Sequence, residues 1–117
     1  MTKKCIVLVS HQSFSAENKS NTSSLNALLD AKKIKRDEVD GSAEHNVERR
    51  NQLFNISGVR GTYPQVFLQD EDESTPQFIG FFEAIQDMNE MNDLPAELVQ
   101  QNNILTFDAV FADVERM

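Results

Sequence analysis

The stretch that decides the fold is Gly58-Val-Arg-Gly-Thr-Tyr-Pro-Gln-Val-Phe-Leu68. Its second half, Tyr63–Leu68, contains Tyr, Val and Phe and predicts a strand that opens on a proline, where the missing N–H is tolerated. Its first residue, Gly58, suits the left-handed position that ends a helix. The stretch therefore predicts a helix, a loop and a strand, in that order along the chain.

The chain turns back on itself after this strand. Four consecutive acidic residues, 70–73, need water around each charge and predict the tip of a hairpin. Thr75–Ile79 predicts a fourth strand that Gly80 ends, and the apolar spacing over 81–92 predicts a helix. After a short turn or helix at Pro95, the final segment has the apolar spacing of an amphipathic helix, with Ile104, Phe107, Val110, Phe111 and Val114 on one stripe.

The first part of the chain alternates strands with helices. Cys5–Val9 is apolar on both faces and predicts a central strand, and the polar residues 10–20 predict a loop. The apolar residues between Leu25 and Ile34 then lie near helical spacing. A side-chain cap for this helix can come from Asn21, Thr22 or Ser23.

Residues 36–40 predict a short second strand, and a second helix runs from Ser42 to about Ile56. The element order is then β-α-β-α-β-β-α with a terminal helix. Strands that alternate with helices favour parallel pairing, whereas a hairpin pairs its strands antiparallel. We therefore expect an α/β fold with a four-stranded mixed sheet flanked by helices, in a single domain over residues 1–117.

The composition excludes several classes of protein. The chain has 117 residues, 39% of them apolar and 26% charged, as in an ordinary globular domain. It carries 19 Asp and Glu against 11 Lys and Arg, and the net charge of −8 argues against nucleic-acid binding. The apolar run Cys5–Val9 is too short to cross a bilayer, so we expect a cytoplasmic protein without membrane contact.

The charge is distributed unevenly along the chain. Residues 1–60 hold ten Lys and Arg against seven Asp and Glu, whereas residues 61–117 hold Arg116 alone against twelve acids. This bipolar pattern can orient a charged partner, although an acidic surface also serves solubility. One cysteine excludes an internal disulfide and a thiolate zinc site, and the two histidines have no ligand-spaced partner, so no metal site is predicted.

Two segments resemble a known family. The stretch 58–68 resembles the Thr-Val-Pro-Gln-Val-Phe signature of glutaredoxins, and Thr75-Pro-Gln-Phe-Ile-Gly80 resembles the Phe-Ile-Gly-Gly that ends their fourth strand. With the element order, this resemblance implies a thioredoxin fold of the glutaredoxin type over about residues 4–92, followed by a helical extension over 93–117. It also implies a cis Tyr63–Pro64 bond and a Tyr63 backbone that faces glutathione.

The chain departs from glutaredoxins at the residues that perform their chemistry. Their Cys-x-x-Cys or Cys-x-x-Ser motif opens the first helix, whose N-terminus stabilises a thiolate, but residues 10–21 contain no cysteine. The single thiol, Cys5, falls inside the first predicted strand, where burial makes it inert. Phe81 replaces the second glycine of the signature and closes space for a ligand carboxylate. We therefore expect no thiol–disulfide oxidoreductase activity.

A redox-inactive branch of the family is more similar. The SH3-binding glutamic-acid-rich proteins have this fold without the cysteine motif, and they share a similar Lys-Ile at the end of the first helix and a Phe-Phe-Glu-Ala, here Phe81-Phe-Glu-Ala84, in the third helix. Their proline-rich ligand segment is missing, so SH3 binding is not implied. No P-x-x-P is formed by the three prolines, Pro64, Pro76 and Pro95.

Six residues are candidates for a ligand groove around the predicted proline loop: His11, Ser13, Arg60, Tyr63, Pro64 and Gly80. His11 follows the first strand, where the active site of this fold opens, and is either an anion contact or an ordinary loop histidine. Ser13, or Ser15 beside it, can offer a hydroxyl near a helix N-terminus, as in serine-type glutathione transferases, or serve as a cap. Arg60 is either an anion contact or a surface arginine.

Two hypotheses follow for the function. The first is a redox-inactive binding or adaptor module, without a cofactor, that contacts a protein or a small anionic ligand through the groove at Pro64. The second is a transferase-like enzyme that binds glutathione and activates its thiol with a Ser hydroxyl. The terminal stripe that contains Phe107 and Phe111 either packs on the chain itself, which favours a monomer, or forms a dimer contact.

Overall fold

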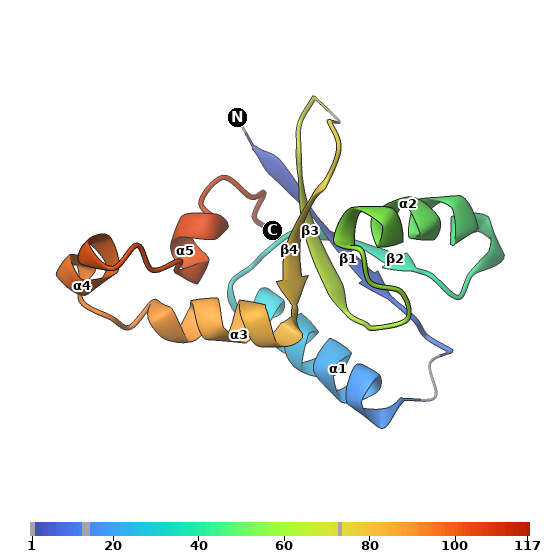
Figure 1. Cartoon of the computed structure of the whole chain (residues 1–117), viewed down its shortest axis with the longest axis horizontal. Coiled ribbons are helices and arrows are strands. Elements are labelled where there is room, and N and C mark those ends of the chain that lie inside the picture. Colours follow the sequence, from blue (N-terminus) through green and yellow to red (C-terminus); the bar gives the residue numbers. More distant parts are fainter. Residues whose placement is uncertain (1, 13–14, 73) are drawn as a thin grey trace.

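The structure, a computed structural model, describes residues 2–12, 15–72 and 74–117 (Figure 1). Four strands form one sheet: β1 (Lys3–Val9), β2 (Arg36–Asp40), β3 (Gln65–Asp70) and β4 (Gln77–Phe81). The helices are α1 (Ala16–Ala31), α2 (Val47–Ser57), α3 (Phe82–Met91), α4 (Ala96–Gln101) and α5 (Phe107–Val110), and a 3₁₀ turn, η1 (Glu44–Asn46), precedes α2.

The sheet has the order β2-β1-β3-β4, with β1 parallel to β2 and antiparallel to β3, and β3 antiparallel to β4. The expected α/β fold with a four-stranded mixed sheet is therefore confirmed. β1 has a neighbour on each side, and its residues from Cys5 to Val9 are almost fully buried. An apolar strand in this position needs a cover on both faces of the sheet.

Different helices cover the two faces of the sheet. On one face, the side chains of Val7 and Leu68 pack with residues from α1, α3 and the C-terminal segment. On the other face, Ile6 and Phe67 pack against Leu53 and Phe54 of α2. Figure 1 shows the same division, with α1 and α3 on the side of the sheet away from α2.

The first helix begins earlier than its sequence suggests. The expected loop over 10–20 is wrong from Ala16 onward, because Ser15 caps α1 and its hydroxyl accepts a hydrogen bond from the Asn18 N–H at 3.2 Å. The polar residues that follow face solvent or are half-buried, and Leu25 and Leu29 anchor the helix in the core. Ile34 is not part of the helix, since Lys33 adopts a left-handed φ of 58°.

Smaller corrections concern the middle of the chain. The second helix was expected from Ser42, but Ser42 bonds the Asp40 carboxylate and η1 intervenes, so α2 starts at Val47. β3 starts two residues later than expected, and Gly80 lies within β4 instead of ending it. Gly58 caps α2 in the left-handed conformation, as predicted, and the Tyr63–Pro64 bond is cis, as the resemblance implied.

The expected terminal helix is wrong over most of its length. In this segment only Phe107–Val110 is helical; residues 111–113 form a turn, and Val114 then bridges to Lys3 at the start of β1. Lys3 N–H donates to the Asp113 carbonyl at 2.6 Å, and Glu115 N–H donates to the Lys3 carbonyl at 3.1 Å. The apolar stripe is nevertheless covered by the chain itself, because Phe107 and Phe111 have no exposed surface. No helix within the described ranges is long and apolar enough to cross a membrane.

Candidate anion-binding site

The loop between α2 and β3 lies against the first turn of α1. The Tyr63 N–H donates to Asn18 Oδ1 at 3.4 Å, which joins two segments that are far apart in the sequence. Gln65 is fully buried, and its Nε2 donates to the carbonyls of Val59 and Thr62 at 2.9 Å each. Pro64 between them is also buried. These contacts tie the loop to α1 and to its own backbone, while Arg60 and Tyr63 lie beside Phe54 of α2.

Two arginines and a tyrosine surround one phenylalanine of α2. The Phe54 ring lies 6.0 Å from the Tyr63 ring, centroid to centroid. The guanidinium of Arg60 lies 5.5 Å from the Phe54 ring centroid, and that of Arg50 lies 5.9 Å from it. Both distances suit cation–π attraction, which holds the cations at the ring. We call this group, Arg50, Phe54, Arg60 and Tyr63, the arginine cluster.

The two arginines differ in how firmly they are held. Arg50 is half-buried, and its Nη1 donates to the Gly41 carbonyl at 3.2 Å while its Nε and Nη2 face Asn51 Oδ1. Arg60 is exposed on the loop. Within the described ranges, neither guanidinium has a carboxylate oxygen within 4.0 Å. The cluster therefore presents two cations without a direct ion-pair partner in these ranges, in a chain whose net charge is −8.

Asp40 organises the neighbouring ends of β1 and β2. One of its oxygens, Oδ1, accepts from the N–H of His11 at 3.2 Å and from the N–H and hydroxyl of Ser42 at 3.0 and 2.6 Å. Burial favours the neutral acid, but these hydrogen bonds and the nearby His11 outweigh it and lower the pKa of Asp40. His11 is thereby tied through its backbone to the strand ends, while its Nε2 lies 3.8 Å from Glu38 Oε2.

Tyr63 keeps its proton at neutral pH. Burial raises the pKa of the phenol, with Arg50 opposing this shift and Asp40 adding to it. The phenol is thus a hydrogen-bond donor close to both charged groups, and a donor complements a carboxylate ligand. The arginine cluster therefore has the chemistry to bind a carboxylate: the exposed guanidinium fork of Arg60, the positive charge of Arg50 beside it and one phenolic O–H.

The structure brings some, but not all, of the six predicted site residues together. Arg60, Tyr63 and Pro64 lie together, and His11 connects to them through Asp40. Gly80 has a packing role, because a Cβ at this position would lie 2.7 Å from the Cβ of Ala84 in α3. Ser13 lies outside the described residues.

Sequence reasoning missed several members of the site: Asn18, Asp40, Arg50 and Phe54. The spacing of Arg50 and Phe54, four residues apart on a predicted helix, was the available signal for a shared face. Asn18 was hidden because its segment was expected to be a loop. No local sequence pattern marked Asp40, because its carboxylate accepts from the His11 N–H only where the end of β1 lies beside the end of β2.

Cys5 is inaccessible to redox chemistry. It is 1% exposed inside β1, and burial raises the pKa of its thiol from 9.0 to about 12, with Arg36 opposing the shift. Because only the thiolate attacks disulfides, we expect negligible labelling of the folded protein by a disulfide reagent at about pH 8. Denatured protein in the same buffer should react fully. Rapid labelling of the folded chain, followed by absorbance, would show that the strand opens.

Comparison with known proteins does not identify the chain: no family model matches it, and no curated protein sequence gives a match.

Proposed function

We propose that this chain is a redox-inactive, glutaredoxin-like binding module whose arginine cluster binds an anionic peptide segment of a protein partner. The single observation that carries the proposal is the pair of guanidinium groups at Phe54, neither with a carboxylate oxygen within 4.0 Å in the described ranges. Charge-assisted hydrogen bonds from arginine to carboxylate are among the strongest that a protein surface offers.

The topology supports the glutaredoxin-like part of the proposal. The strand order β2-β1-β3-β4, with only β1 and β2 parallel, is compatible with a thioredoxin fold. The loop that contains Pro64 lies beside the N-terminal turn of α1 through the Tyr63–Asn18 hydrogen bond. In the resembling family, this is where the groove for the ligand opens.

The local chemistry supports binding without thiol exchange. Ser15 occupies the cap of α1, and Asn18 stands in its first turn, so the start of this helix carries side chains that neither form disulfides nor leave as thiolates. The Tyr63 N–H, which the resemblance assigns to glutathione, donates instead to Asn18. A ligand would therefore be held mainly by side chains of the arginine cluster.

A titration with a short polyglutamate peptide, followed by NMR of the backbone amides, tests the proposal. We expect shifts at Arg60 and Tyr63, weaker binding at high salt, and no response to a polyglutamine peptide of equal length. Arg60→Gln should raise Kd about tenfold, since a hydrogen bond to a charged group is lost. Arg60 is exposed, so this variant leaves the core intact.

The matched control is Arg49→Gln on α2, because Arg49 is already paired with Asp37 at 2.7 Å. Equal weakening by both variants would reduce the effect to overall charge and overturn the assignment of the site, as would an absence of peptide binding. A titration with glutathione is the third comparison, after the polyglutamate and polyglutamine peptides. Tight glutathione binding without peptide binding would favour the transferase-like alternative, although the Ser15 hydroxyl already accepts from the Asn18 N–H.

A further inference from the structure

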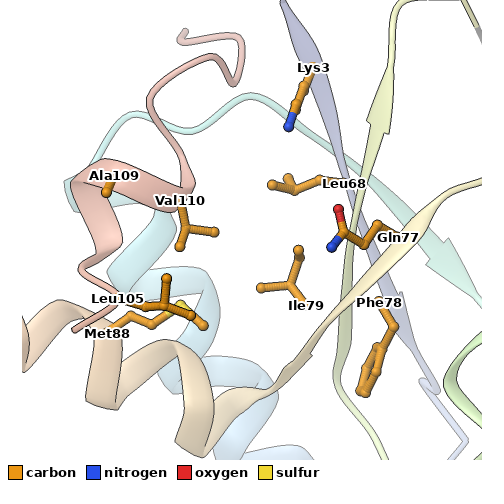
Figure 2. A pocket seen from close by; sticks show the side chains of 9 residues that line it. All are labelled: Lys3, Leu68, Gln77, Phe78, Ile79, Met88, Leu105, Ala109 and Val110. Carbon is orange, nitrogen blue, oxygen red and sulfur yellow. The ribbon is translucent and has the colours of Figure 1, made fainter. Parts of the chain in front are cut away.

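A cavity lies on the opposite face of the sheet from the arginine cluster. It has a volume of about 410 Å³, within the range of about 300–1,000 Å³ that small-molecule sites occupy. Leu68 of β3 and Ile79 of β4 form its floor, as Figure 2 shows. Opposite this floor, the cavity is lined by residues of α3, of α5 and of the segment before α5: Met88, Leu105, Ala109 and Val110.

The cavity exists because α5 is held at a fixed place above the sheet. Phe107 and Phe111 stack at 4.2 Å between ring centroids and are fully buried, and the chain after them pairs with β1. Leu105, which precedes α5, remains 62% exposed at the cavity. An apolar ligand in the cavity would cover the exposed Leu105 side chain and remove its apolar surface from water, which favours binding.

The polar groups of the cavity gather at one end. Lys3 enters from β1, and Figure 2 shows its Nζ directed toward the cavity, with the Gln77 side-chain amide on the same side. In the part of the chain that the structure describes, no carboxylate oxygen lies within 4.0 Å of this ammonium group. Asp70 is opposite Lys3 in the strand register and is the carboxylate that a ligand would have to outcompete.

We propose that this cavity binds a small amphipathic carboxylate, such as a medium-chain fatty acid. The carboxylate accepts hydrogen bonds from Lys3 and Gln77, and the alkyl chain lies along Leu68, Ile79 and Val110. Charge complementarity at one end and an apolar wall over the remainder select this ligand class over a neutral hydrocarbon or a polar anion. The site is independent of the arginine cluster, whose Phe54 packs in the other core.

Octanoate below its micelle concentration is the probe, and octanol, with the same chain and no charge, is the comparison. We expect octanoate to bind more tightly than octanol by calorimetry, with NMR shifts at Ile79, Met88 and Val110. Lys3→Gln should raise the Kd for octanoate about fivefold and remove the preference over octanol. Leu105→Glu, at an exposed position, should weaken octanoate binding by placing a like charge at the cavity.

Lys4→Gln is the matched control, because successive residues of a strand point to opposite faces and Lys4 does not line the cavity. This variant should bind octanoate like the wild type. Equal affinity for octanoate and octanol, no binding of either, or shifts confined to the arginine cluster would each overturn the proposal. Weaker octanoate binding by Lys4→Gln would also overturn the proposal, because it would show that the affinity depends only on overall charge.

Discussion

Phe111→Ala is expected to lower the free energy of unfolding by about 3–5 kcal/mol, the usual cost of removing a buried phenylalanine. Phe111 has no exposed surface and stacks on Phe107 within the core that covers one face of the sheet. A small domain has about 5–15 kcal/mol of stability in total. The variant should therefore show a much lower denaturant midpoint, or be largely unfolded at room temperature.

Leu105→Ala is the control for this change, because it removes a large apolar side chain from the same segment at a position that is 62% exposed. It should change stability by less than about 0.5 kcal/mol. The loss in Phe111→Ala should not depend on protein concentration, since the stripe packs on the same chain. A wild-type dimer in sedimentation that becomes a well-folded monomer on this substitution would instead make the stripe an interface.

Gly80→Ala is expected to destabilise the protein by about 1–3 kcal/mol through overpacking. The new Cβ would lie 2.7 Å from the Ala84 Cβ, a rigid neighbour that can move only with α3, and Gly80 has a φ of +156°. Thermal unfolding followed by circular dichroism measures the loss. An unchanged midpoint would mean that β4 and α3 separate easily.

A double-mutant cycle with Ala84→Gly isolates the contact from the backbone effect. Gly in a helix costs about 1 kcal/mol by itself, but it removes the atom that the new Cβ meets. The double variant should therefore be less destabilised than the sum of the two single variants. Gly61→Ala measures the backbone cost alone, since Gly61 has a φ of +82° and no atom within 4 Å of the added Cβ.

Much of the sheet was predictable because its signals are local. Cys5–Val9 is apolar on both faces, which indicates a covered central strand, and it forms the interior strand β1. Residues 36–40 form β2 with the expected bounds. Gly58 ends α2 as a left-handed cap because that conformation suits glycine wherever the helix packs.

The errors lie where tertiary contacts override a weak or ambiguous pattern. The polar residues from Ala16 onward carry no apolar periodicity, yet they are helical because Ser15 caps them and the leucines behind them anchor the helix. The terminal stripe has helical spacing, but the helix stops at Val110, residues 111–113 turn, and Val114 bridges to Lys3 of β1 instead of continuing the helix. Spacing alone does not record which backbone partner a segment finds.

The sequence by itself determined the α/β class, the mixed sheet and the presence of Arg60 and Tyr63 beside a proline loop, because these depend on residue type and short-range order. Only the tertiary structure brought Arg50 and Arg60 to the same Phe54 ring and left both without a carboxylate in the described ranges. It likewise placed Lys3, from the start of the chain, at one end of a cavity whose wall includes Val110. These side chains are distant along the chain, and they come together only because the strand register and the packing of the helices on the sheet fix their relative positions.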